Sequence, residues 1–178
     1  VEESMLITNI CAGELLSQHN TGIHTTHEGF RAERIGEVKA LLKEEFDGQV
    51  PTDLDTFEGF VTFITKLKNN PDKCHLLAPL KRMMRPSALS SEAKPHMNMG
   101  FKHYATISSP IRRFCDLSNN WAIGQILSKQ KTKSLPSSSI DALNETIDSG
   151  RVACRELEQW LKCQFAKNKV GQEASGHI

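Results

Sequence analysis

The residues most suited to chemistry lie between positions 103 and 127, in the run HYATISSPIRRFCDLSNNWAIGQIL. Ser109 followed by Pro110 is typical of a helix start, because proline lacks the N–H that the first helical position leaves unpaired. We therefore expect a helix to begin at Ser109, with Arg112 in its first turn. Free N–H groups in a first turn favour an anion, and a guanidinium binds phosphate through two parallel hydrogen bonds. A phosphate site at Arg112 is thus one interpretation of this spacing.

Asp116 lies one turn beyond Arg112 in this predicted helix. Its carboxylate would hold the Arg112 guanidinium in position for a phosphate. The same spacing also fits an exposed pair of opposite charges, which contributes only about 0.2–0.5 kcal/mol to helix stability. Spacing alone leaves both interpretations open.

Histidines and cysteines do not predict a metal site. His24 and His27 are three residues apart with only Glu28 beside them, whereas zinc needs three or four ligands. The five cysteines form no C-x-x-C pair, and their odd number does not indicate a disulfide framework. We expect them to be reduced thiols of a cytoplasmic protein.

The densest group of cations in the chain is Lys81, Arg82 and Arg85, within a predicted short helix over 72–85. Helices routinely carry such charges on a solvated face. A solvated face is therefore the plainer interpretation of this group.

The hydrophobic pattern predicts further helices on both sides of these motifs. Apolar residues recur at helical spacing over 1–19, over 31–46, in a helix that begins at Asp53 as N-cap after Pro51 and ends before Pro71, and over 140–168. A short β-like run ends at His27, and the alternation over 96–108 predicts a β element there. The fold class expected is α+β and mostly helical.

The first helix places two polar residues on one face. Glu2 and Asn9 are seven residues apart, while Leu6, Ile10 and Leu15 define an apolar face elsewhere. We expect the apolar face to be buried and the Glu2–Asn9 face to be available for polar contacts.

Charge and composition exclude several classes of protein. The 178 residues carry a formal net charge of +1, and 38% of them are hydrophobic. The mean hydropathy is −0.40, and no stretch reaches the ~20 apolar residues that a membrane span needs. A near-neutral charge also argues against a free-standing binder of duplex DNA. We expect no membrane association, no DNA partner and only a local contact with any nucleic acid.

Several blocks of sequence resemble the ribonuclease II/R (RNB) family of exoribonucleases. The run YATISSPIRRFCD at 104–116 resembles the family signature S-P-I-R-[RK]-[YF]-x-D. VEESMLITN at 1–9 resembles its V-E-E-x-M-x-x-A-N helix, and RVACRELEQW at 151–160 resembles the helix that closes its catalytic domain. The resemblance implies that residues 1–172 are the C-terminal part of an RNB catalytic domain. It also implies that 173–178 begin an OB-fold RNA-binding domain.

The resemblance further implies an activity and a set of site residues. The expected activity is 3′-to-5′ hydrolysis of single-stranded RNA to nucleoside 5′-monophosphates, assisted by Mg²⁺. Arg112 would bind the scissile phosphate as the catalytic residue, and Glu2 would recognise a ribose. Further substrate-binding residues would be Asn9, Tyr104, Ser109, Arg113 and Asp116. The family's metal-binding aspartates lie upstream of the matching region, so we assign no metal ligand within this chain.

Two expectations about the whole protein follow. We expect the chain to be an excised part of a monomeric enzyme, inactive and only marginally stable by itself, because faces that cover missing parts would be exposed. The alternative is a catalytically inactive RNA-binding or regulatory relative with the same fold. An adaptor without nucleic acid would leave the S-P-I-R-R block unexplained.

Overall fold

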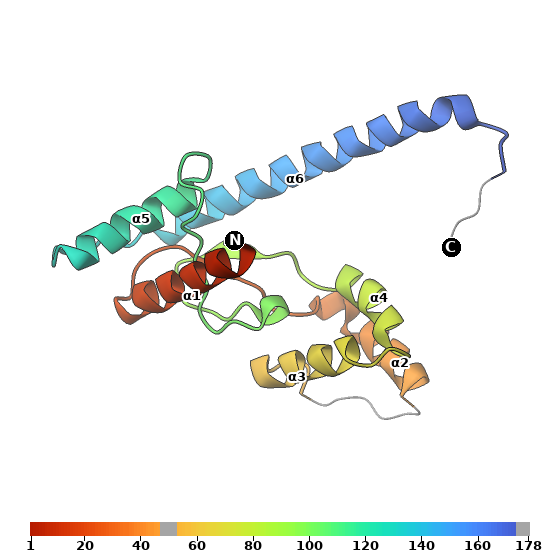
Figure 1. The fold of residues 1–178 in the computed structure, drawn as a ribbon, viewed down its shortest axis with the longest axis horizontal. Coiled ribbons are helices and arrows are strands. Elements are labelled where there is room, and N and C mark those ends of the chain that lie inside the picture. Colours follow the sequence, from red (N-terminus) through yellow and green to blue (C-terminus); the bar gives the residue numbers. More distant parts are fainter. Residues whose placement is uncertain (47–52, 174–178) are drawn as a thin grey trace. The chain divides into compact units, whose positions relative to one another are not determined.

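The computed structural model describes residues 1–46 and 53–173. They are mostly helical with one small antiparallel sheet, so the α+β expectation is confirmed. The chain divides into two compact units, Val1–Ile140 and Asp141–Ile178. Figure 1 labels the helices, which are α1 (Glu2–Gln18), α2 (Ile35–Glu45), α3 (Phe57–Lys68), α4 (Leu77–Arg82), α5 (Phe114–Leu127) and α6 (Ser137–Ala166).

Helices α2, α3 and α4 share one hydrophobic core in the first unit. α3 contributes Phe60, Ile64 and Leu67 at helical spacing, and all three are buried. Val38 and Leu42 of α2 are fully buried in the same cluster, as is Leu80 of α4. The periodicity of these segments therefore predicts both the helices and their buried faces.

The start of α3 corrects one expectation. Its N-cap is Thr56, whose hydroxyl accepts a hydrogen bond from the Gly59 N–H at 3.2 Å. Asp53, the expected cap, lies one turn earlier, and its carbonyl accepts from the Thr56 N–H. Pro51 lies outside the described residues.

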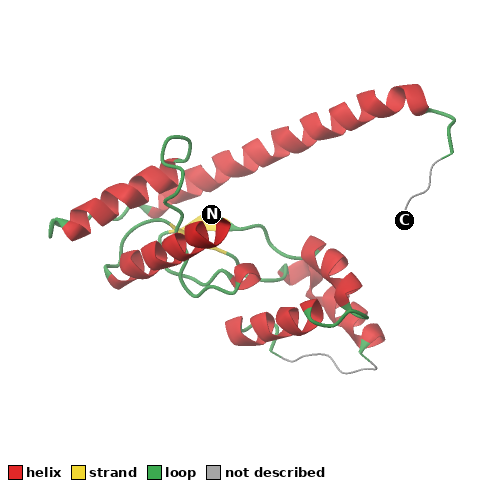
Figure 2. Ribbon diagram, in the orientation of Figure 1, coloured by secondary structure: helices red, strands yellow, loops and turns green. Residues whose placement is uncertain are grey.

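The sheet consists of β1 (His24–Thr26) and β2 (Ala88–Ser90), which pair antiparallel with Thr25 opposite Leu89 (Figure 2). The β-like run ending near His27 is thus confirmed. The β element expected over 96–108 is wrong, because this segment has a short 3-10 helix η3 (Met97–Met99), isolated bridges at His96 and Phe101, and loop. The segment joins β1 and His27 through single backbone hydrogen bonds, from the Thr25 N–H to the Tyr104 carbonyl and from the Met97 N–H to the His27 carbonyl, rather than as a paired strand.

Helices α1 and α5 pack together, with Leu16 of α1 and Ala122 of α5 in a second small core. The side of α1 that is buried is not the apolar face expected from the sequence. Buried positions are Asn9, Ala12, Gly13 and Leu16, whereas Ile7 is exposed and Leu6, Ile10 and Leu15 are half-buried. Gly13 explains why this side of α1 is buried, because a Cβ there would lie 2.7 Å from the Tyr104 backbone nitrogen. The close approach of the 103–104 backbone to α1 at this point therefore requires glycine.

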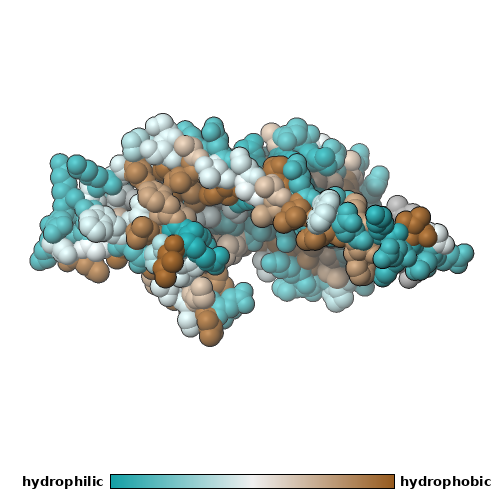
Figure 3. All heavy atoms as spheres, turned by 90° about the horizontal axis from the view of Figure 1, so that it is seen from above, coloured by the Kyte–Doolittle hydropathy of each residue, from teal (hydrophilic) through white to brown (hydrophobic). Residues whose placement is uncertain are grey.

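The second unit consists mainly of the long helix that the sequence predicts near 140–168. α6 begins a few residues earlier, at Ser137, and every described residue from 151 to 173 is exposed. Its exposed apolar side chains include Val152, Leu157, Trp160 and Phe165, and apolar and polar surfaces alternate there in Figure 3. Within the described ranges, no helix is long and apolar enough to cross a bilayer. Residues 174–178, where the next domain is expected to start, lie outside the described part.

Candidate functional site

Six of the seven predicted site residues line one open pocket of about 490 Å³ in the first unit. We call it the Arg112 pocket. Its wall is formed by the N-terminal half of α1, the 104–109 loop and the two arginines before α5. The lining residues are Val1, Glu2, Met5, Leu6, Asn9, Tyr104, Thr106, Ser108, Ser109, Arg112 and Arg113. Positions more than 100 residues apart in the chain are thereby placed around one space.

Arg112 and Glu2 are the two charged side chains of this pocket that remain available to a ligand. Both are exposed, and within the described residues neither side chain forms a hydrogen bond or an ion pair. An unpaired guanidinium can bind a phosphate, and an unpaired carboxylate can accept a hydrogen bond from a hydroxyl group. The pocket therefore offers one group for an anion and one for a donor.

The start of α5 differs from the expectation drawn from Ser109 and Pro110. Residues 109–112 form a turn, in which the Ser109 carbonyl accepts from the N–H groups of Arg112 and Arg113. Arg113 then has extended backbone angles (φ −126°, ψ 116°), so the helix begins at Phe114. Arg112 consequently lies in the turn before the helix rather than in its first turn.

The partner of Asp116 is also a correction. The carboxylate binds Arg113, with Nη2 at 2.7 Å and Nε at 3.1 Å from Oδ2, and not Arg112. The extended Arg113 breaks the helical spacing that would have brought Arg112 over Asp116. Arg113 is held in place by this ion pair, and Arg112 is left free.

Asp116 is fully buried beneath the pocket and joins several parts of it. Its Oδ1 accepts from the Thr106 hydroxyl at 2.7 Å, and its Oδ2 accepts from the Ser109 N–H at 2.8 Å. Burial by itself would raise the pKa of Asp116, but hydrogen bonds from Thr106, Ser109, Cys115 and Arg113 outweigh burial and lower that pKa. The carboxylate is therefore charged at neutral pH and fixes the 106–109 loop against α5.

Asn9 fixes the other end of the same loop. Its side-chain oxygen accepts from the Ile107 N–H at 3.1 Å, and its amide donates to the Tyr104 hydroxyl at 3.1 Å. Tyr104 is itself buried, with its ring stacked on Phe101. Asn9 and Tyr104 thus shape the pocket wall through contacts with each other, and a direct contact of either with substrate stays a prediction.

Two residues that sequence analysis did not select also support the site. Thr106 lines the pocket and donates to Asp116. Asn119, fully buried on α5, accepts from the Ile23 N–H at 2.7 Å and donates to the carbonyls of Ile23 and Thr106. Asn119 lies near Asp116 on the helical wheel, and this shared polar face is the signal that could have indicated it.

The described residues do not provide a site for the expected Mg²⁺. Among them, no three His, Cys, Asp or Glu side chains are grouped so that they could hold a metal ion. His24 and His27 are both buried, and His27 stacks on His96 with ring centroids 5.4 Å apart. We therefore assign no metal-dependent step to residues of this chain.

Comparison with known proteins agrees with this geometry. The family model described as RNB domain matches residues 1–129, which include every lining residue of the Arg112 pocket. The chain belongs to the RNB-domain family. The likeness to this family is thereby confirmed, and residues of the 1–9 and 104–116 blocks line one pocket in this RNB chain.

The related proteins are much longer than this chain. The chain is 34% identical over 174 residues to Exoribonuclease 2 of Psychromonas ingrahamii, and 33% identical over 172 residues to Exoribonuclease 2 of Baumannia cicadellinicola. Each match covers 96% of this chain and 26% of the relative. The RNB chain therefore spans about a quarter of the length of the curated relatives that it matches.

Solved structures share the fold at low sequence identity. Mycoplasma genitalium RNase R in complex with double-stranded RNA matches with a TM-score of 0.77 and 19% identity, over 99% of this chain and 34% of that chain. The same protein in complex with ribose methylated single-stranded RNA gives a TM-score of 0.74 over 96% of this chain and 28% of that chain. The chain thus shares its fold with part of this RNase R.

Proposed function

We propose that the protein carrying this chain is a 3′-to-5′ exoribonuclease that hydrolyses single-stranded RNA to nucleoside 5′-monophosphates. The observation that carries the proposal is the unpaired Arg112 guanidinium, which shares an open pocket with the unpaired Glu2 carboxylate in a chain of the RNB family. RNA offers each group a partner, namely a phosphodiester and a ribose 2′-hydroxyl. DNA lacks the hydroxyl and is not an expected substrate.

Arg112 acts on the scissile phosphate in this proposal. Phosphodiester hydrolysis builds negative charge on the phosphate oxygens, and a preorganised guanidinium stabilises that charge. Arg113 cannot stabilise this charge in the same way, because Asp116 accepts two of its N–H groups. The Arg113–Asp116 pair instead holds the turn from which Arg112 projects.

Glu2 recognises the ribose, and the remaining predicted residues position the two charged groups. Asn9 and Tyr104 hold the loop that faces α1, and the backbone of Ser109 is tied to Asp116. Mg²⁺ remains the proposed metal, held by residues other than those described here. The expected cytoplasmic location and monomeric state of the protein stay predictions.

The test is Arg112→Lys in the whole protein that contains this chain. Lysine keeps the positive charge but lacks the planar pair of donors, so a contact that strengthens in the transition state is lost while most binding remains. We expect single-turnover cleavage of a single-stranded RNA to slow by about 100-fold, with a much smaller change in equilibrium affinity. Arg34→Lys is the matched control, since Arg34 is exposed and pairs with Glu37 away from the pocket.

Two results would contradict the proposal. A parallel loss of affinity and rate in Arg112→Lys would assign Arg112 to ground-state binding only. A wild-type protein that binds RNA but does not cleave it with Mg²⁺ present would favour the binding-only alternative.

A further inference from the structure

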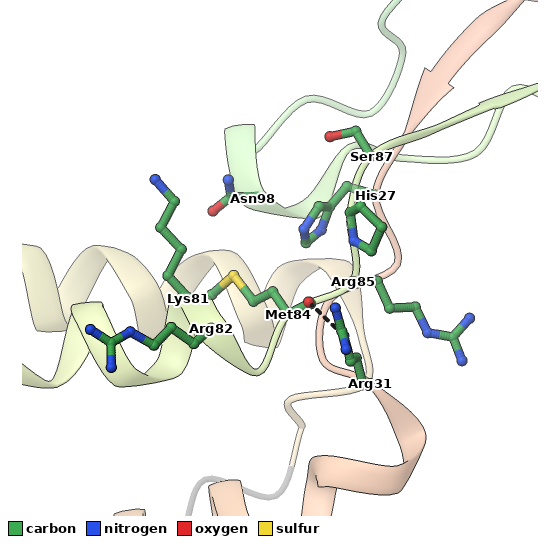
Figure 4. Close-up of a pocket in the computed structure, with 9 residues that line it drawn as sticks. His27, Arg31, Lys81, Arg82, Met84, Arg85, Ser87 and Asn98 are labelled. Carbon is green, nitrogen blue, oxygen red and sulfur yellow. Dashed lines mark hydrogen bonds between the residues drawn. The ribbon is translucent and has the colours of Figure 1, made fainter. Parts of the chain in front are cut away.

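A second pocket in the same unit is lined by cations and by no acidic residue. It has a volume of about 280 Å³, close to the lower end of the ~300–1,000 Å³ range of small-ligand sites. We call it the Lys81 pocket. Its lining residues are His27, Arg31, Lys81, Arg82, Met84, Arg85, Pro86, Ser87 and Asn98. Figure 4 shows that these side chains come from α4, from the segments next to β1 and β2, and from η3.

The four cations of this pocket are not equally available. Arg85 donates to Glu28 at 2.7 Å, and in Figure 4 its side chain points away from Lys81 and Arg82. Arg31 donates its Nε–H to the Met84 carbonyl at 3.2 Å, which holds the guanidinium at the pocket wall. Lys81 and Arg82 are exposed, and neither forms a hydrogen bond or an ion pair with any described residue.

A solvated helix end is the alternative explanation for Lys81 and Arg82, which lie in the last turn of α4. Cations are stabilised there by the helix dipole and by unpaired carbonyls. However, neither side chain donates to those carbonyls among the described residues. The Leu80 carbonyl accepts instead from the Met83 N–H. The two charges therefore lie in solvent without a partner of their own among the described residues, and in Figure 4 Lys81 lies on the side of Asn98.

The Lys81 pocket and the Arg112 pocket are linked by a short row of rings. His27 lines the first pocket and Tyr104 lines the second. His96 lies between them, with ring centroids 5.4 Å from His27 and 5.9 Å from Tyr104. All three rings are buried, so the two pockets are neighbours in the same unit, separated by this row.

The rings themselves carry little charge. Burial, together with the neighbouring His27, lowers the pKa of His96 to about 4, and burial also lowers the pKa of His27. At neutral pH both rings are uncharged. The positive potential of the pocket thus comes from the arginines and Lys81.

We propose that the Lys81 pocket binds a phosphodiester of the same RNA strand whose 3′ end occupies the Arg112 pocket, through Lys81, Arg82 and Arg31. This inference rests on the proposed function, because that function makes RNA the ligand. Unpaired cations around a small cavity suit a phosphate group, and Asn98 adds an amide donor for its oxygens. A free mononucleotide or inorganic phosphate has the same chemistry, and the experiment separates these sources.

The experiment measures binding of single-stranded RNA by the whole protein, with a chelator present so that binding is separated from cleavage. The probes are oligoadenylates of about 4 and about 16 nucleotides, the two ends of the range of single-strand site sizes per OB-fold domain. The variant is Lys81→Gln with Arg82→Gln. The matched control is Lys39→Gln with Lys43→Gln, which removes two exposed cations from α2 that line neither pocket.

We expect the Lys81–Arg82 variant to weaken binding of the long oligoadenylate and to leave the short one unchanged. The slope of log affinity against log salt should fall in magnitude by about 0.7, the value for one lost phosphate contact with a single strand. The control variant should leave the salt slope and the affinity for both probes almost unchanged, with only the small effect that follows from its lower net charge.

Four outcomes would overturn the proposal. In the first, the variant binds both probes as its control does. In the second, the short and long probes are weakened equally. In the third, adenosine monophosphate or inorganic phosphate competes for the pocket as well as the long RNA does. A drop in thermal stability without a change in salt slope supports the helix-end explanation and also overturns it. RNA binding without cleavage in the wild-type protein counts against the proposed function but leaves this binding test valid.

Discussion

At the scale of single residues, Asp116 connects the loop, the turn and the helix that form the Arg112 pocket. Its side chain is fully buried and accepts from Thr106, Ser109 and Arg113. A buried carboxylate with this many donors is stable only in its charged form, which is why the pKa of Asp116 is lowered. Removing the charge leaves several buried donors without a full partner.

Asp116→Asn should therefore destabilise the chain by about 3 kcal/mol, because one amide oxygen replaces two carboxylate oxygens among these donors. Urea unfolding measures the change. Asp148→Asn is the control, since Asp148 pairs with Arg151 on the exposed surface of α6, where the expected effect is below about 0.5 kcal/mol.

The pH dependence gives this prediction a second readout. Because the pKa of Asp116 is lowered in the folded state, its contribution is present above the ordinary value of ~3.9 and is lost as pH falls through the lower folded pKa. The difference between wild type and Asp116→Asn should shrink below about pH 4. A difference that stays constant down to strongly acid pH would contradict the role given to this carboxylate.

At the scale of elements, the approach between α1 and the 103–105 segment depends on the absence of one side chain. Gly13 lies in the middle of α1, where alanine has the higher helix propensity. A Cβ at this position would nevertheless meet three backbone atoms of residues 103 and 104 at 2.7–2.9 Å. The backbone of the loop that carries Tyr104 would have to move.

Gly13→Ala should destabilise the chain by about 2 kcal/mol, since overpacking against backbone outweighs the gain in helix propensity. Gly124→Ala is the matched control inside α5, because nothing lies within 4 Å of its added Cβ. That variant should be more stable than wild type by about 0.5–1 kcal/mol. Thermal unfolding compares the two, and equal shifts of the same sign would show that α1 does not pack this closely.

At the scale of the whole molecule, the two units differ in how their helices are stabilised. α3 buries Phe60 and Leu67 in a shared core. From residue 151 onward, by contrast, α6 has only exposed side chains among the described residues, including Leu157, Trp160 and Phe165. An isolated helix without tertiary packing is marginal in water.

Hydrogen exchange on the 178-residue chain should show this difference directly. Amides of residues 151–166 should exchange much faster than those of α3, whose opening requires loss of the core. The exchange is measured at a concentration where the chain is monomeric. Equally slow exchange in both helices at that concentration would contradict the exposure of α6 and show that its apolar side chains are covered.

Local patterns were enough to predict much of this chain. The spacing of Phe60, Ile64 and Leu67 predicts α3 and its buried face, and the period over 140–168 predicts most of α6. The S-P-I-R-R block and the 1–9 block contain most of the predicted site residues that line the Arg112 pocket, and the chemical roles of these residues stay predictions. The helices could be predicted because helical periodicity is a property of short segments.

Only the tertiary structure decided which groups meet. Asn9 and Gly13 are buried on α1 while Leu6, Ile10 and Leu15 are only half-buried, because the 103–107 segment meets α1 through a hydrogen bond to Asn9 and a close backbone approach at Gly13. Asp116 pairs with Arg113 rather than Arg112, because the chain is extended at Arg113 before α5 begins. Likewise the strand that pairs with β1 lies at 88–90, not at 96–108. In each case the deciding partner is distant in sequence or set by a local break in regular backbone, and periodicity carries no information about either.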